Sequence, residues 1–142
     1  MKRRFTLSRA LAITFVLLAC DETPTAPSPK SVRLGESFDL KVGETARLEG
    51  DSLILTFNAV RSDSRCPVDV TCIQAGEAVV VFDARAEGSE RRELVFDVPP
   101  GGGDEERFAR YRIRIVELRP PAESTKTIDP ASYVARVLLE RS

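Results

Sequence analysis

Apolar and polar residues alternate with a period of two along most of residues 36–141. The segment RFARYRIRIVEL, residues 107–118, is the clearest case, because its tyrosine and isoleucines alternate with arginines. A helix would distribute those arginines around its circumference, whereas a strand places them on one side. The period therefore predicts half-buried β-strands, and we expect residues 107–118 to form one of them.

Seven segments share this period, and turn-rich stretches separate them. Their inward positions are Phe38, Leu40 and Val42; residues 45–48; Leu53, Leu55, Phe57 and Ala59; Ala78, Val80, Phe82 and Ala84; Leu94, Phe96 and Val98; Tyr111, Ile113 and Ile115; and Tyr133, Ala135, Val137 and Leu139. The turn-rich stretches are residues 49–52, 63–76, 86–90, 98–106 and 119–131. Val79 and Val81 make one segment apolar on both faces, which predicts a strand in the interior of its sheet.

Short, regularly spaced strands without helices are typical of antiparallel sandwiches and small barrels. We expect an all-β fold, an antiparallel β-sandwich of immunoglobulin-like type with about seven strands; a small β-barrel is the alternative. Residues 32–142 are expected to form this single domain. A domain of that length buries roughly two-thirds of its unfolded surface, which is enough for a core.

The N-terminal sequence MKRRFTLSRALAITFVLLAC has the features of a secretory signal. Four basic residues precede an apolar stretch at residues 10–19, which as a helix spans roughly 15 Å, about half a bilayer core. A signal peptide at residues 1–19 is therefore favoured over a membrane span. The tetrapeptide LLAC at 17–20 resembles the bacterial lipobox. That resemblance implies cleavage before Cys20, which then carries a diacylglycerol and an acylated amino group, palmitate being one such acyl chain. The alternative is an ordinary signal peptide that contains a cysteine.

A polar, proline-containing segment, DETPTAPSPKS, follows at residues 21–31. It has too little apolar surface to compensate for the entropy of ordering, and its prolines favour extended conformations. Residues 20–31 are therefore predicted to tether the domain to a membrane of the bacterial cell envelope, facing the periplasm or the cell surface. Removal of residues 1–19 takes four basic residues from a chain with 21 basic and 22 acidic ones, which leaves a net charge of −5. Such a chain is not adapted to nucleic acid.

The composition excludes several kinds of catalytic site. The chain has no histidine, hence no Ser-His-Asp or Cys-His arrangement and no imidazole metal site. It also has no Ser-x-x-Lys, and residues 101–103 do not continue as a phosphate-binding loop would. The acidic residues 104–106 beside those glycines are a weak alternative for calcium, although a solvated hairpin tip is favoured. We expect no enzymatic activity, no cofactor and no metal.

The sequence DSRCPVDVTCIQAG, residues 63–76, contains the two cysteines left after Cys20. Export to an oxidising compartment predicts that Cys66 and Cys72 form a structural disulfide. Pro67 restricts the same loop, and Gly76 is expected at a sharp turn into the next strand. A redox pair and a metal site are the alternatives; the first usually has Cys-x-x-Cys spacing, and the second needs further ligands.

Arginines at three alternate positions form a candidate basic face. Arg110, Arg112 and Arg114 are spaced to lie on one side of a strand, where they are suited to bind an acidic glycan, a lipid phosphate or an acidic partner. The alternative is an exposed face whose arginines pair with glutamates on neighbouring strands.

The segment FNAVRSDSRCPVDVTCIQAGEAVVVF, residues 57–82, resembles the core of an uncharacterised family of small bacterial lipoproteins with a DSRCP-x4-C-x2-AG motif. The resemblance extends to FDLKVGETARL at 38–48, YRIRIVELRPP at 111–121 and the strand with Tyr133 and Ala135. It implies an architecture and a lipid anchor but not an activity. Gln74 stands where that family commonly has an aromatic residue, often Trp, and Pro121-Ala122 replaces a more usual Tyr-Pro.

These observations favour a non-catalytic binding or interaction module on a lipid tether. A stiffened loop on a rigid β-scaffold is a common way to present contacts to a partner. The predicted contact residues are Arg65, Pro67, Val68, Asp69, Val70, Thr71 and Gln74. The expected partner is an envelope protein or a glycan. The alternatives are a structural envelope component and a protease-inhibitor-like module; an enzyme that uses carboxylates or the thiol pair is least favoured.

Overall fold

The computed structural model describes residues 28–142, which form nine β-strands and one short 3-10 turn. The elements are β1 (Lys30–Val32), β2 (Ser37–Lys41), β3 (Thr45–Leu48), β4 (Ile54–Asp63), β5 (Ala78–Arg85), β6 (Arg92–Val98), β7 (Asp104–Phe108), β8 (Tyr111–Arg119), η1 (Pro130–Ser132) and β9 (Val134–Arg141). The predicted signal peptide and Cys20 lie outside the described residues. Within residues 28–142, no helix has the length and apolar character needed to span a membrane.

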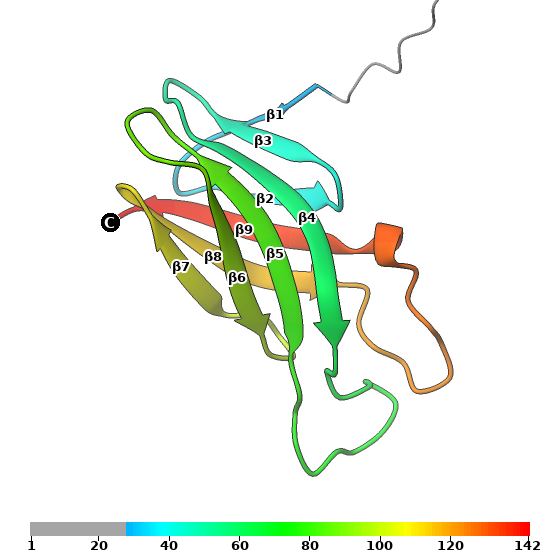
Figure 1. Cartoon of the computed structure of the whole chain (residues 1–142). Coiled ribbons are helices and arrows are strands. Elements are labelled where there is room, and N and C mark those ends of the chain that lie inside the picture. The colour runs from blue at the N-terminus through cyan, green and yellow to red at the C-terminus, as the bar shows by residue number, and fades with distance from the viewer. Residues whose placement is uncertain (1–27) are drawn as a thin grey trace, which may run out of the picture.

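Two sheets pack face to face (Figure 1). One has the strand order β1-β3-β4-β5-β6 and the other β2-β9-β8-β7. All neighbouring strands are antiparallel except β1 and β3. The predicted β-sandwich is therefore confirmed, and neither of the described sheets closes into the alternative barrel.

The core lies between the sheets and is built from the inward positions that the alternation predicts. Phe57 and Phe82 stack with their ring centroids 4.8 Å apart, and Phe96 meets Phe82 edge-on at 5.7 Å. Such pairs contribute about 0.5–1.5 kcal/mol beyond their buried area. β5 has neighbours on both sides, as its two apolar faces predicted, and Val81 on its second face is also buried.

The open edges of β6 and β7 are joined by side chains. The Arg92 guanidinium donates to the Arg107 carbonyl, and the Asp104 carboxylate accepts from the Asp97 N–H at 2.7 Å. Unpaired strand edges promote aggregation, so these bonds protect the sandwich on this side.

The strand expected at residues 107–118 is two strands, and this expectation was wrong. β7 ends at Phe108, Ala109 adopts a φ of 52°, and the chain returns as β8 from Tyr111. The stretch 98–106, expected to be a turn throughout, supplies the first residues of β7. Arg110 therefore lies in the hairpin turn and does not share a strand with Arg112 and Arg114.

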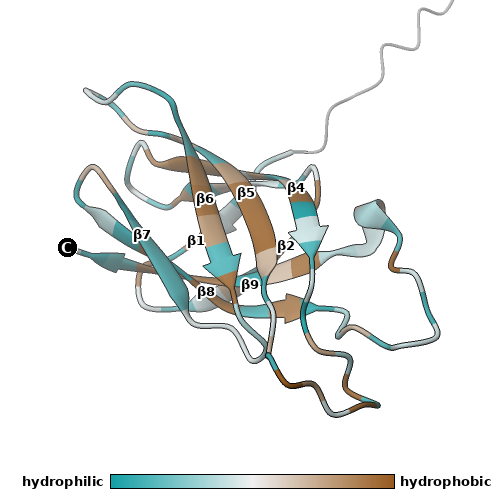
Figure 2. Ribbon diagram, turned by 60° about the horizontal axis from the view of Figure 1, so that its bottom comes forward, coloured by the Kyte–Doolittle hydropathy of each residue, from teal (hydrophilic) through white to brown (hydrophobic). Residues whose placement is uncertain are grey.

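The N-terminus of the described chain and the loop between β4 and β5 lie at opposite ends of the sandwich (Figure 1). β1 begins at Lys30, so the last two residues of the predicted tether belong to the five-stranded sheet. A second view shows the same separation (Figure 2). A tether at the N-terminus would therefore leave the β4–β5 loop free at the far end.

A candidate interaction surface at the disulfide loop

The connection from β4 to β5, residues 64–77, contains the cysteine pair and is called the disulfide loop below. Cys66 and Cys72 are bonded, with their Cα atoms 5.9 Å apart, which confirms the predicted disulfide. Because the two cysteines are only six residues apart, loop closure contributes about 2 kcal/mol to stability. The larger consequence is local, since the tip of the loop loses conformational freedom.

Backbone hydrogen bonds hold the base of the disulfide loop together. The Ser64 N–H donates to the Glu77 carbonyl at 2.8 Å, and the Cys66 N–H donates to the Ala75 carbonyl at 2.7 Å. Gly76 has a φ of +63°, and a Cβ added there would lie 1.8 Å from the Ser64 carbonyl oxygen. The sharp turn predicted at Gly76 is confirmed, and the close approach of two backbone segments requires glycine.

Arg65 is buried under the loop, although we predicted it among the contact residues. Its side chain donates to both oxygens of the Asp63 carboxylate, at 2.8 and 2.6 Å. It also donates to the carbonyls of Leu118 and Pro120, at 2.8 and 2.9 Å. With only 7% of the residue exposed, Arg65 joins the end of β4 to the end of β8 and is withdrawn from the surface.

Tyr133 completes this buried network. Its hydroxyl donates to the Asp63 carboxylate at 2.9 Å. Burial raises the pKa of the Asp63 carboxyl, but hydrogen bonds from Arg65 and Tyr133 outweigh it and hold that pKa below 3.8, its ordinary value. Burial and the bond to Asp63 raise the pKa of Tyr133 to about 12. The network therefore requires an ionised Asp63 and a neutral Tyr133.

We expect low pH to reduce the stability of the protein, because protonation of Asp63 weakens its bonds to Arg65 and Tyr133. A carboxyl whose pKa is lower in the folded than in the unfolded protein stabilises the fold at pH values above its pKa in the unfolded protein. This stabilisation is lost as the pH falls through its pKa in the folded protein. The free energy of unfolding should therefore drop below about pH 4 more steeply for the wild type than for Asp63→Asn. Urea unfolding at a series of pH values measures the difference; parallel curves would contradict the assignment.

The loop between β8 and β9, residues 120–133, supports the disulfide loop from the side. The Asp69 carboxylate accepts from the Ser124 N–H at 2.9 Å and from the Ser124 hydroxyl at 2.5 Å. These bonds hold the pKa of Asp69 below its ordinary value. The Val68 N–H donates to the Ala122 carbonyl at 2.9 Å. Asp69, which we predicted as a contact residue, thus joins the disulfide loop to the β8–β9 loop, and its carboxylate is already engaged by Ser124.

The tip of the disulfide loop exposes three branched apolar side chains. The exposed fractions of Val68, Val70 and Ile73 are 69%, 47% and 106%. Among the described residues, only Val95 is a further large hydrophobic residue with comparable exposure. Brown segments mark this tip in Figure 2. Ile73 was not among the predicted contact residues. Its position could have indicated the role, because it is a large apolar residue in a stretch otherwise typical of turns.

A pocket of about 180 Å³ lies beside the loop, where three connections converge. It is lined by Arg65, Cys66, Val68, Pro99, Pro100, Gly101, Glu117, Leu118, Arg119, Pro121 and Ala122. Thr71 and Gln74 are exposed on the disulfide loop, and Pro67 is half-buried. The predicted residues Pro67, Val68, Val70, Thr71 and Gln74 therefore do lie together on one loop.

The candidate basic face is divided between two ion-paired groups. Arg110, in the β7–β8 turn, donates to both oxygens of Asp51 at 2.8 and 2.9 Å. Arg112 and Arg114 lie on β8 and share Glu105 of β7, with closest N–O distances of 3.8 and 2.9 Å. These are the cross-strand pairs of the alternative interpretation. Between residues 28 and 142, no group of three or more potential metal-ligating side chains comes together.

Comparisons with protein-family models, with curated proteins and with solved structures give no match to this chain.

Proposed function

We propose that the chain is a lipid-anchored interaction module of the bacterial cell envelope, which uses the tip of the disulfide loop to bind a partner protein without catalysing a reaction. The observation that carries the proposal is the exposure of Val68, Val70 and Ile73 on a loop that is braced from three directions. Apolar side chains grouped on a protein surface are typical of binding sites.

The bracing supports binding because it removes much of the entropy that a flexible loop loses on association. The disulfide, Arg65 and the Asp69–Ser124 bonds hold the backbone, while the three apolar side chains remain exposed. Full burial of a valine or isoleucine side chain contributes about 1.5–3 kcal/mol. A rigid loop transfers more of that energy to affinity than a loop that must first be ordered.

The position of the loop also suits a tethered module. The described chain begins at the opposite end of the sandwich (Figure 1). If Cys20 carries the lipid, several acyl chains attach the protein durably, and the loop extends toward partners away from that membrane.

Site-specific photo-crosslinking in the source cells tests the proposal. We expect a crosslinking amino acid at Ile73 to give a defined protein adduct, whereas the same amino acid at Val95 should give none. Val95 is the matched control because it is exposed and apolar but lies on β6, away from the disulfide loop.

Two further variants separate the roles of the loop. Val68→Ser should weaken the adduct by removing apolar contact, and Cys66→Ser with Cys72→Ser should weaken it by releasing the tip. The proposed contact surface would be contradicted if the crosslinking amino acid gave the same yield of adduct at Ile73 and at Val95. It would also be contradicted if the adduct at Ile73 were unchanged in both variants.

A further inference from the structure

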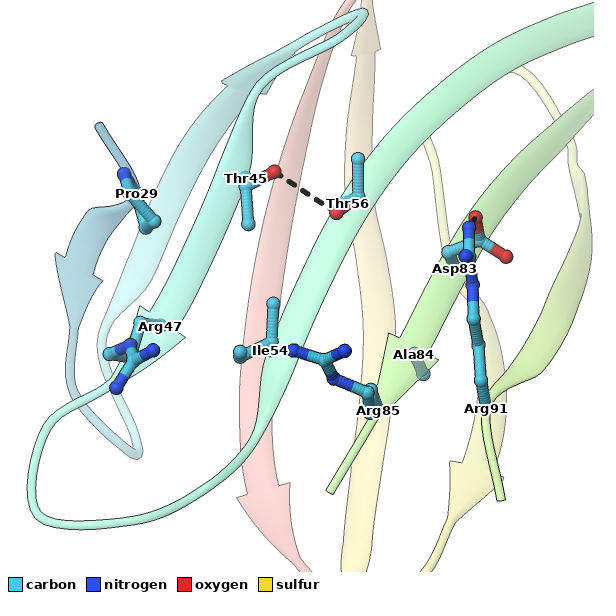
Figure 3. Close-up of a pocket in the computed structure, with 9 residues that line it drawn as sticks. All are labelled: Pro29, Thr45, Arg47, Ile54, Thr56, Asp83, Ala84, Arg85 and Arg91. Atoms are coloured by element: carbon cyan, nitrogen blue, oxygen red, sulfur yellow. Dashed lines mark hydrogen bonds and ion pairs between the residues drawn. The ribbon is translucent and has the colours of Figure 1, made fainter. Parts of the chain in front are cut away.

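A groove of about 390 Å³ lies on the outer face of the five-stranded sheet (Figure 3). We call it the arginine groove; it is lined by Pro29, Thr45, Arg47, Ile54, Thr56, Asp83, Ala84, Arg85 and Arg91. It is formed where β3 and β5 end and β4 begins. This is the opposite end of β4 and β5 from the disulfide loop, and no function considered above uses it.

The strand register places two arginines on either side of one apolar side chain. Arg47 of β3 pairs with Ile54 of β4, and Ile54 pairs with Arg85 of β5. Paired residues project to the same face of a sheet, so both guanidinium groups lie over this part of the surface. Figure 3 shows Arg85 reaching toward Ile54, with Arg47 on the other side.

Among the described residues, these two arginines have no partner of the kind that most other arginines have. Within residues 28–142, neither Arg47 nor Arg85 has a carboxylate within ion-pair distance or a side-chain hydrogen bond, whereas Arg91 pairs with Asp83. Three arginines against one aspartate leave the groove with a net positive charge. Guanidinium groups on either side of Ile54 are suited to bind an oxyanion between them, because each can donate two parallel hydrogen bonds to phosphate.

The floor of the groove offers one further donor. Thr45 and Thr56 face each other across β3 and β4 with their hydroxyl oxygens 3.0 Å apart (Figure 3). Only one of these hydroxyl hydrogens is needed for the bond between them, so the other remains able to donate to an oxyanion.

The N-terminal segment determines where this groove lies relative to the membrane. Pro29 lines the groove and is nine positions after Cys20 in the sequence. Nine extended residues span at most about 30 Å. A lipid on Cys20 would therefore let the arginine groove reach the membrane surface, where anionic lipids attract arginines over a distance of about 10 Å.

We propose that the arginine groove binds the phosphate of an anionic phospholipid headgroup in the membrane that holds Cys20. This inference rests on the lipid anchor of the proposed function and deepens it. The acyl chains hold the protein to the membrane, and Arg47 and Arg85 orient it, so that the disulfide loop points away from the bilayer. The net negative charge of the rest of the domain favours the same orientation, because an anionic surface repels it as a whole.

Arginine footprinting on the lipidated chain tests this orientation. The full protein is purified from the source membranes, its mass is measured to read the modification of Cys20, and it is reconstituted into vesicles of phosphatidylcholine alone or with phosphatidylglycerol. The rate of modification by an arginine-specific glyoxal is then measured for each arginine. We expect Arg47 and Arg85 to react roughly 30-fold more slowly on the anionic vesicles, the change that two surface arginines produce.

Arg107 and Arg141 are the internal controls, because both are exposed and neither has an ion-pair partner among the described residues. Their rates should not differ between the two kinds of vesicle. Arg91 also lines the groove and should react more slowly on the anionic vesicles. This protection should be lost in Arg47→Ser with Arg85→Ser, whereas it should remain in Arg107→Ser with Arg141→Ser, which removes the same charge.

The outcomes that overturn the inference are distinct from those that overturn the proposed function. Unchanged rates at Arg47 and Arg85 on a lipidated chain would overturn the groove but leave the crosslinking result at Ile73 standing. Equal protection by inorganic phosphate on neutral vesicles would assign the groove to a soluble anion. An unmodified Cys20 would overturn the lipid anchor, and the groove's role with it.

Discussion

Replacement of Asp63 by alanine is expected to lower the free energy of unfolding by about 3–5 kcal/mol, because it leaves the buried Arg65 guanidinium without a counter-charge. The exposed fractions of the two side chains are 5% for Arg65 and 10% for Asp63. Arg65 would keep its bonds to the carbonyls of Leu118 and Pro120, but carbonyls do not neutralise a buried charge. Urea unfolding measures the loss.

A surface ion pair supplies the matched control for Asp63. Arg61 and Glu93 are joined at 2.6 Å, but their side chains are 53% and 46% exposed. Solvent screens such a pair, so Glu93→Ala should cost less than about 1 kcal/mol. If Asp63→Ala costs no more than Glu93→Ala, the buried network does not brace the disulfide loop.

The tertiary partners of Arg65 explain why its role could not be predicted from the sequence. Its two carbonyl partners lie 53 and 55 residues further along the chain, beyond any local pattern. An arginine beside Cys66 in a polar, turn-rich stretch is most simply interpreted as exposed. The disulfide and the turn at Gly76 could be predicted because each depends on residues close together in sequence.

The strands could be predicted where the alternation of apolar and polar residues is bounded at both ends by residues typical of turns. Tyr111, Ile113 and Ile115 face the core as expected. The β7–β8 hairpin escaped prediction because its two-residue turn is Ala109-Arg110, without the Asn or Gly that such turns usually carry. One local signal was present: Phe108 and Tyr111 are aromatic residues three positions apart, so on a single strand Phe108 would face outward with the arginines.

The second large effect is expected from Gly76→Ala, which should lower the free energy of unfolding by about 2–5 kcal/mol. A left-handed backbone conformation costs an L-residue about 1–2 kcal/mol. The added Cβ would also lie 1.8 Å from the Ser64 carbonyl oxygen, and relieving such an overlap costs about 1–3 kcal/mol more. Ser64 is the first residue of the disulfide loop, so the displacement would act on the backbone that positions Cys66.

Gly88→Ala separates the two contributions. Gly88 has a φ of +72°, close to the +63° of Gly76, but no atom of the described residues lies within 4 Å of an added Cβ. It should therefore show only the conformational cost, about 1–2 kcal/mol. The difference between the two variants, measured by urea unfolding, isolates the contact between Gly76 and Ser64. Equal losses would mean that the base of the loop adapts freely, and the disulfide would then be the principal restraint on the tip.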